Sequence, residues 1–153
     1  MSDLTIAMPH DPMEKWENVT ILLLNNQPDT TTLLSDWFGA LGASVHHLRG
    51  LDLCHHVDES RQLLNTIRPD VVLFDLSIPY EQNWLCFKYL SEIALFGATP
   101  MMLTTTSRRA VDEIIGQTDA FELLGTPHDL WHLQELVECR VSAKRAGSTS
   151  TRH

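Results

Sequence analysis

The sequence has no long apolar run. Although 43% of its 153 residues are hydrophobic, no stretch approaches the roughly 18 consecutive apolar residues that a membrane span needs. Its start, Met1 to Thr20, mixes Asp, Pro, Glu and Lys and lacks the apolar core of a signal peptide. We therefore expect a cytoplasmic protein that has no membrane partner.

Cysteine is also scarce. The three cysteines, Cys54, Cys86 and Cys139, are odd in number and widely separated. Their surroundings are apolar or amphipathic, which favours core filling over disulfides. We expect reduced thiols.

Basic residues are few, with 11 Lys and Arg against 20 Asp and Glu and a formal net charge of −9. Such a charge repels the phosphates of nucleic acids, so we expect no nucleic-acid partner. The only basic cluster in the sequence, Arg140, Lys144, Arg145 and Arg152, falls in a Ser/Thr/Gly-rich ending. This composition predicts a flexible C-terminal tail over residues 141–153.

The length suffices for one buried core. We expect an N-terminal extension over residues 1–18, a domain over residues 19–140, and the tail. Three runs inside this domain are apolar at consecutive positions, as in strands covered on both faces; they are Ile21–Leu24, Val71–Phe74 and Met101–Leu103. Two more polar segments, Ala43–Leu48 and Ala120–Leu124, are predicted to be edge strands.

Segments with helical spacing of apolar residues separate these strands. They contain Leu33 to Leu41, Val57 to Ile67, Trp84 to Ile93, Val111 to Ile115, and Leu130 to Val141. Turn residues agree with these limits: Pro28-Asp29 precedes the first helix, Gly42 follows it, Arg68-Pro69 ends the second and Gly97 ends the third. Right-handed crossovers then predict an α/β fold, with helices on both faces of a doubly wound parallel five-stranded sheet.

Ligands of such a sheet bind beyond the carboxyl ends of its strands. The residues there are Asn25-Asn26, Asp75, Thr104-Thr105 and Thr126-Pro127. These segments resemble the receiver domain of bacterial two-component response regulators. "ILLLNNQPDT" is similar to the first strand and its acidic loop, "RPDVVLFDLSIP" to the phosphoacceptor strand, "PMMLTTTS" to the fourth strand and "FELLGTPHDL" to the fifth.

The resemblance covers about residues 19–140 and implies a flavodoxin-like (βα)5 fold with strand order 2-1-3-4-5. It implies that Asp75 is the phosphoacceptor and that Thr104 binds the phosphoryl group. In the family an acidic pair holds Mg²⁺ and a lysine pairs with the phosphoryl oxygens, so that charge neutralisation supplies most of the catalysis. Asp75 and the backbone of Ser77 would be the Mg²⁺ ligands here.

The sequence departs from this pattern at the charged positions. Asn25 and Asn26 replace the acidic pair, Thr126 replaces the lysine, and Leu123 stands where the family carries an aromatic switch residue. We therefore expect no resident cofactor and at most weak Mg²⁺ binding, because Mg²⁺ prefers anionic oxygen ligands.

Structural roles are alternatives for these residues. Asp75 would cap a turn, Thr104, Thr105 and Thr106 would end a strand and cap the next helix, and the two asparagines would hold their loop by hydrogen bonds, which we prefer to metal binding. A metal site at His46-His47 and Cys54-His55-His56 is disfavoured, because adjacent residues of a strand point to opposite faces. The apolar stripe of the last helix, with Leu130, Trp131 and Leu133, is a partner surface or, more commonly, core.

The leading hypothesis is a degenerate receiver that signals through protein–protein interaction in a two-component phosphorelay and is not an enzyme beyond self-phosphorylation and dephosphorylation. A histidine kinase or another signalling protein would be its partner, and the resemblance implies a homodimer through the fourth and fifth helices. The first alternative is an active receiver that a histidine kinase phosphorylates at Asp75. The second is a small flavodoxin-like ligand binder, although Asn25 to Pro28 lack the hydroxyl groups of a phosphate loop.

Overall fold

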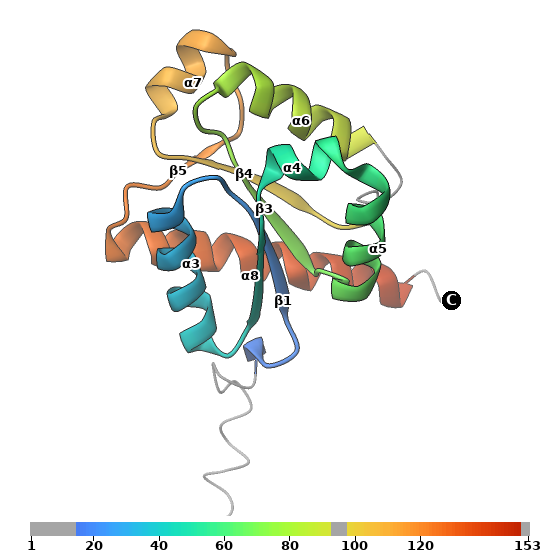
Figure 1. Ribbon diagram of the computed structural model, residues 1–153. Helices are drawn as coiled ribbons and strands as arrows, with labels where there is room; N and C mark the ends of the chain where they lie inside the picture. Colours follow the sequence, from blue (N-terminus) through green and yellow to red (C-terminus); the bar gives the residue numbers. More distant parts are fainter. Residues whose placement is uncertain (1–14, 93–97, 151–153) are drawn as a thin grey trace, which may run out of the picture.

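A parallel sheet of five strands forms the centre of the computed structural model, which describes residues 15–92 and 98–150 (Figure 1). The strands lie in the order β2-β1-β3-β4-β5. They are β1 (Thr20–Leu24), β2 (Ser44–Leu48), β3 (Val71–Asp75), β4 (Met101–Thr105) and β5 (Phe121–Glu122). This order and the parallel direction confirm the predicted flavodoxin-like fold.

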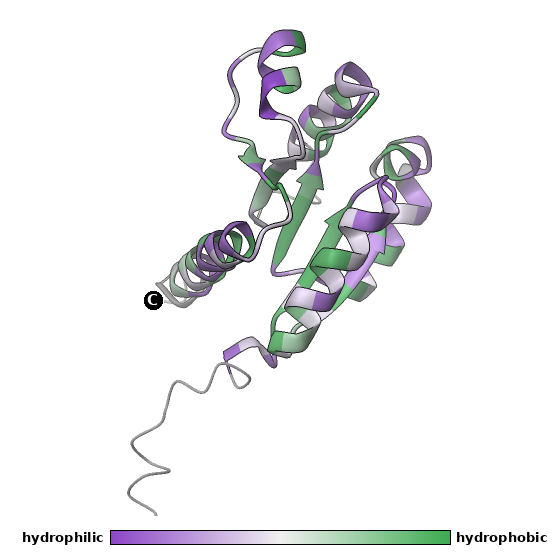
Figure 2. Ribbon diagram, turned by 90° about the vertical axis from the view of Figure 1, so that its left-hand side faces the viewer, coloured by the Kyte–Doolittle hydropathy of each residue, from purple (hydrophilic) through white to green (hydrophobic). Residues whose placement is uncertain are grey.

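Helices cover both faces of the sheet, as predicted. One face carries α3 (Pro28–Leu41) and α8 (Pro127–Ser150). The other face carries α4 (Gly50–His55), α5 (Val57–Ile67), α6 (Tyr80–Glu92) and α7 (Arg108–Ile114). Figure 2 shows the apolar central strands between these two layers.

The alternation of side chains along each strand divides the core into two clusters. In β1, Ile21 and Leu23 pack with α3 and α8, whereas Leu22 and Leu24 pack with the helices of the other face. Successive residues of a strand point to opposite faces, so a strand covered on both faces must be apolar throughout. This explains why β1 and β3 were recognisable as continuous apolar runs.

The predicted turn residues define the helix ends that the structure describes. Pro28-Asp29, which we predicted to precede α3, forms its first two residues, and Gly42 ends it with a φ of 111°, which an L side chain rarely adopts. Arg68, just before Pro69, ends α5 with a φ of 51°. Gly97, which we predicted to end α6, lies outside the described residues.

Short helix α4 was not predicted. Its six residues, Gly50–His55, are too few to show a helical period. Gly50 packs on β3, because a Cβ added there would lie 3.4 Å from the Phe74 ring. The sequence between β2 and β3 therefore forms two helices instead of one.

The cysteine prediction was wrong for two of the three residues. Cys54 in α4 and Cys86 in α6 form a disulfide, with a Cα–Cα distance of 6.2 Å. Because α4 was not foreseen, the proximity of these two cysteines was not foreseen either. Cys139 is free and exposed.

The structure also differs from the two predicted terminal segments. Trp16, placed in the N-terminal extension, is buried and packs against Phe38 with ring centroids 5.5 Å apart. The last helix passes through residue 141 and continues to Ser150, with Val141 buried. Lys144 donates to the carbonyl of Pro69, and Arg145 donates to the carbonyl of Asn18 at 2.9 Å. Lys144 and Arg145 of the basic cluster thus attach α8 to the loops that precede β3 and β1.

Candidate functional site

Asp75 is the last residue of β3, and its register partner in β4 is Thr104. The Thr104 hydroxyl donates a hydrogen bond of 3.2 Å to Asp75 Oδ1. Both side chains are buried, with 2% and 1% of their surfaces exposed. Parallel pairing of two apolar strands is therefore enough to bring the predicted phosphoacceptor and hydroxyl residue together.

Burial dominates the electrostatics of Asp75. Removal of the carboxylate from water raises its pKa from 3.8 to about 6, although hydrogen bonding from Thr104 lowers it. The nearby Ser77 hydroxyl also lowers the pKa of Asp75, although Ser77 Oγ is buried without a hydrogen-bond partner among the described residues. Asp75 Oδ2 also has no partner among the described residues. The site thus holds one acid whose second oxygen is unsatisfied.

Asn25 holds the loop after β1. Its Oδ1 accepts a hydrogen bond of 2.7 Å from the Gln27 backbone amide, and its own backbone amide donates to the Leu48 carbonyl of β2. The side chain is buried. These contacts agree with the preferred interpretation, in which the first asparagine serves the loop.

Asn26 reaches across to α6. Its Nδ2 donates to Asn83 Oδ1 at 3.3 Å, while its own Oδ1 is buried without a partner among the described residues. Asn83 in turn donates from Nδ2 to the carbonyls of Ser77, at 2.9 Å, and Pro79, at 3.1 Å. One amide therefore connects the loop after β1 to the loop after the Asp75 strand.

Sequence reasoning missed Asn83. We assigned Trp84, Leu85, Phe87, Leu90 and Ile93 to the apolar stripe of this helix. Leu90 is buried and Trp84 and Phe87 pack against the core, whereas Leu85 is 62% exposed, Asn83 is buried, and Ile93 lies outside the described residues. The position of Asn83, four residues after Pro79, could have indicated this role. Side chains in the first turn of a helix often bond to the backbone of the preceding loop. Nothing in the sequence shows that Asn83 is fully buried.

The residues present fit Mg²⁺ poorly. Asp75 is the only carboxylate among the predicted site residues, Asn25 Oδ1 is taken by Gln27, and the carbonyl of Ser77 accepts a hydrogen bond from Asn83. Mg²⁺ demands near-octahedral oxygen ligation and dehydrates reluctantly. A single anionic ligand compensates this cost weakly.

Thr105 has a different role from that of Thr104. Its hydroxyl donates to the Leu76 carbonyl at 2.8 Å and accepts from the Ser107 amide at 3.2 Å. Ser107 is the N-cap of α7. Thr105 thus attaches the loop after β3 to the residue that caps α7, but it is not itself the cap.

Thr126 caps a helix at the position where the family has its lysine. Its hydroxyl accepts a hydrogen bond from the Asp129 amide, and Asp129 Oδ2 accepts from the amides of Leu124 and Thr126. Thr126 is exposed, and its side chain bonds to the start of α8 instead of Asp75. Leu123, at the position expected for the aromatic switch, is buried in the core cluster that α8 covers.

Thr126→Ala is expected to lower the free energy of unfolding by about 1 kcal/mol, because one amide at the start of α8 loses its acceptor. Urea denaturation measures this change. Thr66→Ala is the matched control, since Thr66 is an exposed helical threonine whose hydroxyl bonds within its own helix. An equal loss in both variants would contradict a capping role.

The remaining predicted features are separate from Asp75. His46 and His47 are exposed, and His47 Nε2 lies 2.7 Å from the Asn25 carbonyl. Over residues 15–92 and 98–150, no group of three or more His, Cys, Asp or Glu side chains is placed to hold a metal. On α8, Leu130 and Leu133 are buried, whereas Trp131 is 61% exposed.

No helix in the described part of the chain has the length and apolar character required to cross a membrane. Comparison with models of protein families and with curated proteins found no match.

Solved receiver domains share the fold. The chemotaxis response regulator CheY4 of Vibrio cholerae is similar with a TM-score of 0.56 and 17% identity, over 78% of this chain and 98% of that one. The signal receiver domain of a LuxO repressor protein from Vibrio parahaemolyticus gives a TM-score of 0.60 and 15% identity, over 88% of this chain and 98% of that one. The chain therefore has the fold of response-regulator receiver domains.

Proposed function

We propose that this chain is a degenerate receiver domain that signals through protein–protein interaction in a two-component phosphorelay. The observation that carries the proposal is the charge at the strand ends: Asp75 lies buried beside Thr104, while Asn25, Asn26 and Thr126 are neutral and engaged elsewhere. Phosphoryl transfer depends on positioning and charge neutralisation. The positioning residues are present here, and the neutralising charges are absent from these positions.

A change in partner affinity would be the output of such a domain. Its partner would be a histidine kinase or another signalling protein, in the cytoplasm. The homodimer through the fourth and fifth helices of the family corresponds to α7 and α8, where Ile114 and Trp131 are exposed. This dimer is part of the proposal.

The wild-type chain is expected to gain no phosphoryl group when incubated with acetyl phosphate and Mg²⁺. The triple variant Asn25→Asp, Asn26→Asp, Thr126→Lys is expected to gain one, because it recovers the two acids and the base that neutralise the transferring group. Intact-mass spectrometry measures the adduct. Adding Asp75→Asn to the triple variant should remove it.

Asn65→Asp provides a charge control, because Asn65 is exposed on α5, outside the set of site residues. A phosphoryl adduct on the wild-type chain that Asp75→Asn abolishes would overturn the degenerate interpretation. That outcome would support the active receiver, which the contact between Thr104 and Asp75 favours. A triple variant without an adduct would show that these three positions do not explain the loss.

A further inference from the structure

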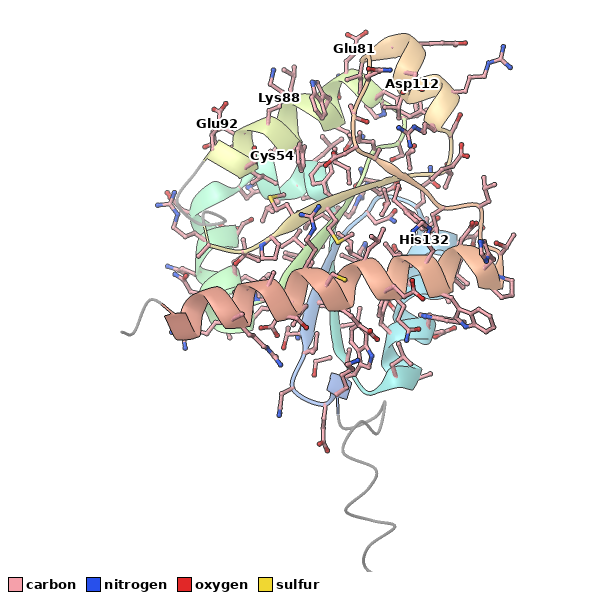
Figure 3. The ribbon with its side chains drawn as sticks, turned by 180° about the vertical axis from the view of Figure 1, so that it is seen from behind. Cys54, Glu81, Lys88, Glu92, Asp112 and His132 are labelled. Carbon is pink, nitrogen blue, oxygen red and sulfur yellow. A yellow bond between two sulfur atoms is a disulfide. The ribbon has the colours of Figure 1, made fainter. Side chains whose placement is uncertain are left out.

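The disulfide between Cys54 and Cys86 joins the two helices that flank the end of β3. Cys54 belongs to α4 and Cys86 to α6, 32 residues further along the chain. Figure 3 labels Cys54, which lies beside α6. Both cysteines line a surface hollow with Leu51, Leu85 and Tyr89, but Cys86 is buried and Cys54 is partly exposed. A reagent from solution therefore meets the disulfide at Cys54.

Both crosslinked helices contact the neighbours of Asp75. On α6, Asn83 lies three residues before Cys86 and binds the carbonyls of Ser77 and Pro79. On α4, Gly50 packs against the ring of Phe74, the residue before Asp75. The disulfide thus joins α4, which packs against the residue before Asp75, to α6, which binds the loop after Asp75.

The surroundings also accommodate the reduced cysteines. Cys86 Sγ lies 3.2 Å from the Gly50 carbonyl oxygen, so a thiol there has an acceptor. Cys54 Sγ lies 3.8 Å from the Cys86 carbonyl oxygen. Opening the disulfide would therefore leave neither thiol buried without a partner, which removes one cost of reduction.

We propose that Cys54 and Cys86 form a reversible thiol–disulfide site whose state controls the order of the Asp75 loop. The proposal rests on the cytoplasmic location proposed above, because disulfides in that compartment are usually transient or redox-sensing. A cellular dithiol or glutathione would be the reductant. The closed form fixes α4 against α6 covalently, whereas in the open form only non-covalent contacts join the two helices.

The chemistry is thiol–disulfide exchange. A reductant thiolate attacks Cys54 Sγ, the bond between the two cysteines breaks, and Cys86 leaves as a thiolate that takes up a proton. A second reductant thiol then attacks the mixed disulfide and releases Cys54 as a thiol. The cysteine pair gains two electrons and two protons, and the reductant is oxidised to its own disulfide.

The first test equilibrates the full chain in buffers of graded oxidised-to-reduced glutathione ratio and counts free thiols by maleimide labelling and mass. We expect labelling to change from Cys139 alone to all three cysteines within this range. The Cys139→Ser variant should show the same midpoint. A pair that stays closed, or stays open, in every buffer would overturn the proposal.

The second test compares hydrogen exchange of peptides from residues 76–92 before and after reduction with a phosphine. We expect severalfold faster exchange in the reduced protein, with β1 unchanged. In the double variant Cys54→Ser, Cys86→Ser, exchange should match that of the reduced protein and should not change when the phosphine is added. The Cys139→Ser variant should respond to the phosphine like the wild type. Equal exchange in both redox states would overturn the proposal. Neither test uses a phosphodonor, so their failure is distinguishable from failure of the proposed function.

Discussion

Asp75→Asn is expected to raise the free energy of unfolding by about 3 kcal/mol above pH 7. The gain arises because the wild-type chain must keep a charged carboxylate in a site whose burial raises its pKa to about 6, against an ordinary value of 3.8. Asparagine has nearly the same shape and carries no charge. Its Oδ1 can accept the Thr104 hydrogen bond, and its Nδ2 takes the place of Oδ2, the oxygen without a partner among the described residues.

The pH dependence gives the sign of the effect. Between pH 3.8 and about 6 the folded wild-type protein retains a proton that the unfolded chain has lost, so its stability falls as the pH rises through this window. The advantage of the variant should therefore be absent below pH 3.8, about half developed at pH 5 and complete above pH 7.

Urea denaturation of both proteins at several pH values measures the difference. The control is Asp112→Asn, because Asp112 is exposed on α7. That variant should match the wild type within about 0.5 kcal/mol at every pH. A difference in unfolding free energy between Asp75→Asn and the wild type that stays constant across this pH range would contradict a raised pKa of Asp75 in the folded protein.

Trp16→Ala is expected to lower the free energy of unfolding by about 3–5 kcal/mol. The reason is its burial: 1% of Trp16 is exposed, and its ring packs against Phe38 of α3 in the cluster beneath α8. Loss of the indole removes a large apolar surface and leaves a cavity. Residue 16 would then belong to the folded domain and not to an extension.

Trp131→Ala is the matched control, because the same side chain is 61% exposed there, and it should change stability by less than about 0.5 kcal/mol. Trp16→Phe should cost much less than Trp16→Ala, since Trp16 Nε1 has no hydrogen-bond partner to lose among the described residues. Equal denaturation curves for Trp16→Ala and Trp131→Ala would contradict the assignment of Trp16 to the core.

The strands and the site positions were predictable because their signals are local. Ile21 to Leu24 and Val71 to Phe74 are apolar at every position, which only a strand covered on both faces requires. Asp75 and Thr104 follow such strands directly, so parallel pairing alone places them side by side. Gly42 and Arg68-Pro69 end their helices through their own backbone conformation, so their effect does not depend on distant residues.

The features that were missed depend on contacts between distant segments. Asn83 is buried because the loops after β1 and β3 meet over α6. Cys54 meets Cys86 because α4, too short to show a period, packs against α6. Trp16 is buried because α3 and α8 lie on the same face of the sheet.

The amino-acid sequence by itself determined the order of the strands and of the helices other than α4, the parallel sheet and the neutral residues at the strand ends, because hydrophobic period, turn chemistry and charge are properties of short segments. Only the tertiary structure decided what those residues touch: that Thr126 caps α8, that Asn83 joins two loops, and that two cysteines meet between α4 and α6. Burial and pairing depend on how helices pack across the sheet, and no single segment encodes that packing.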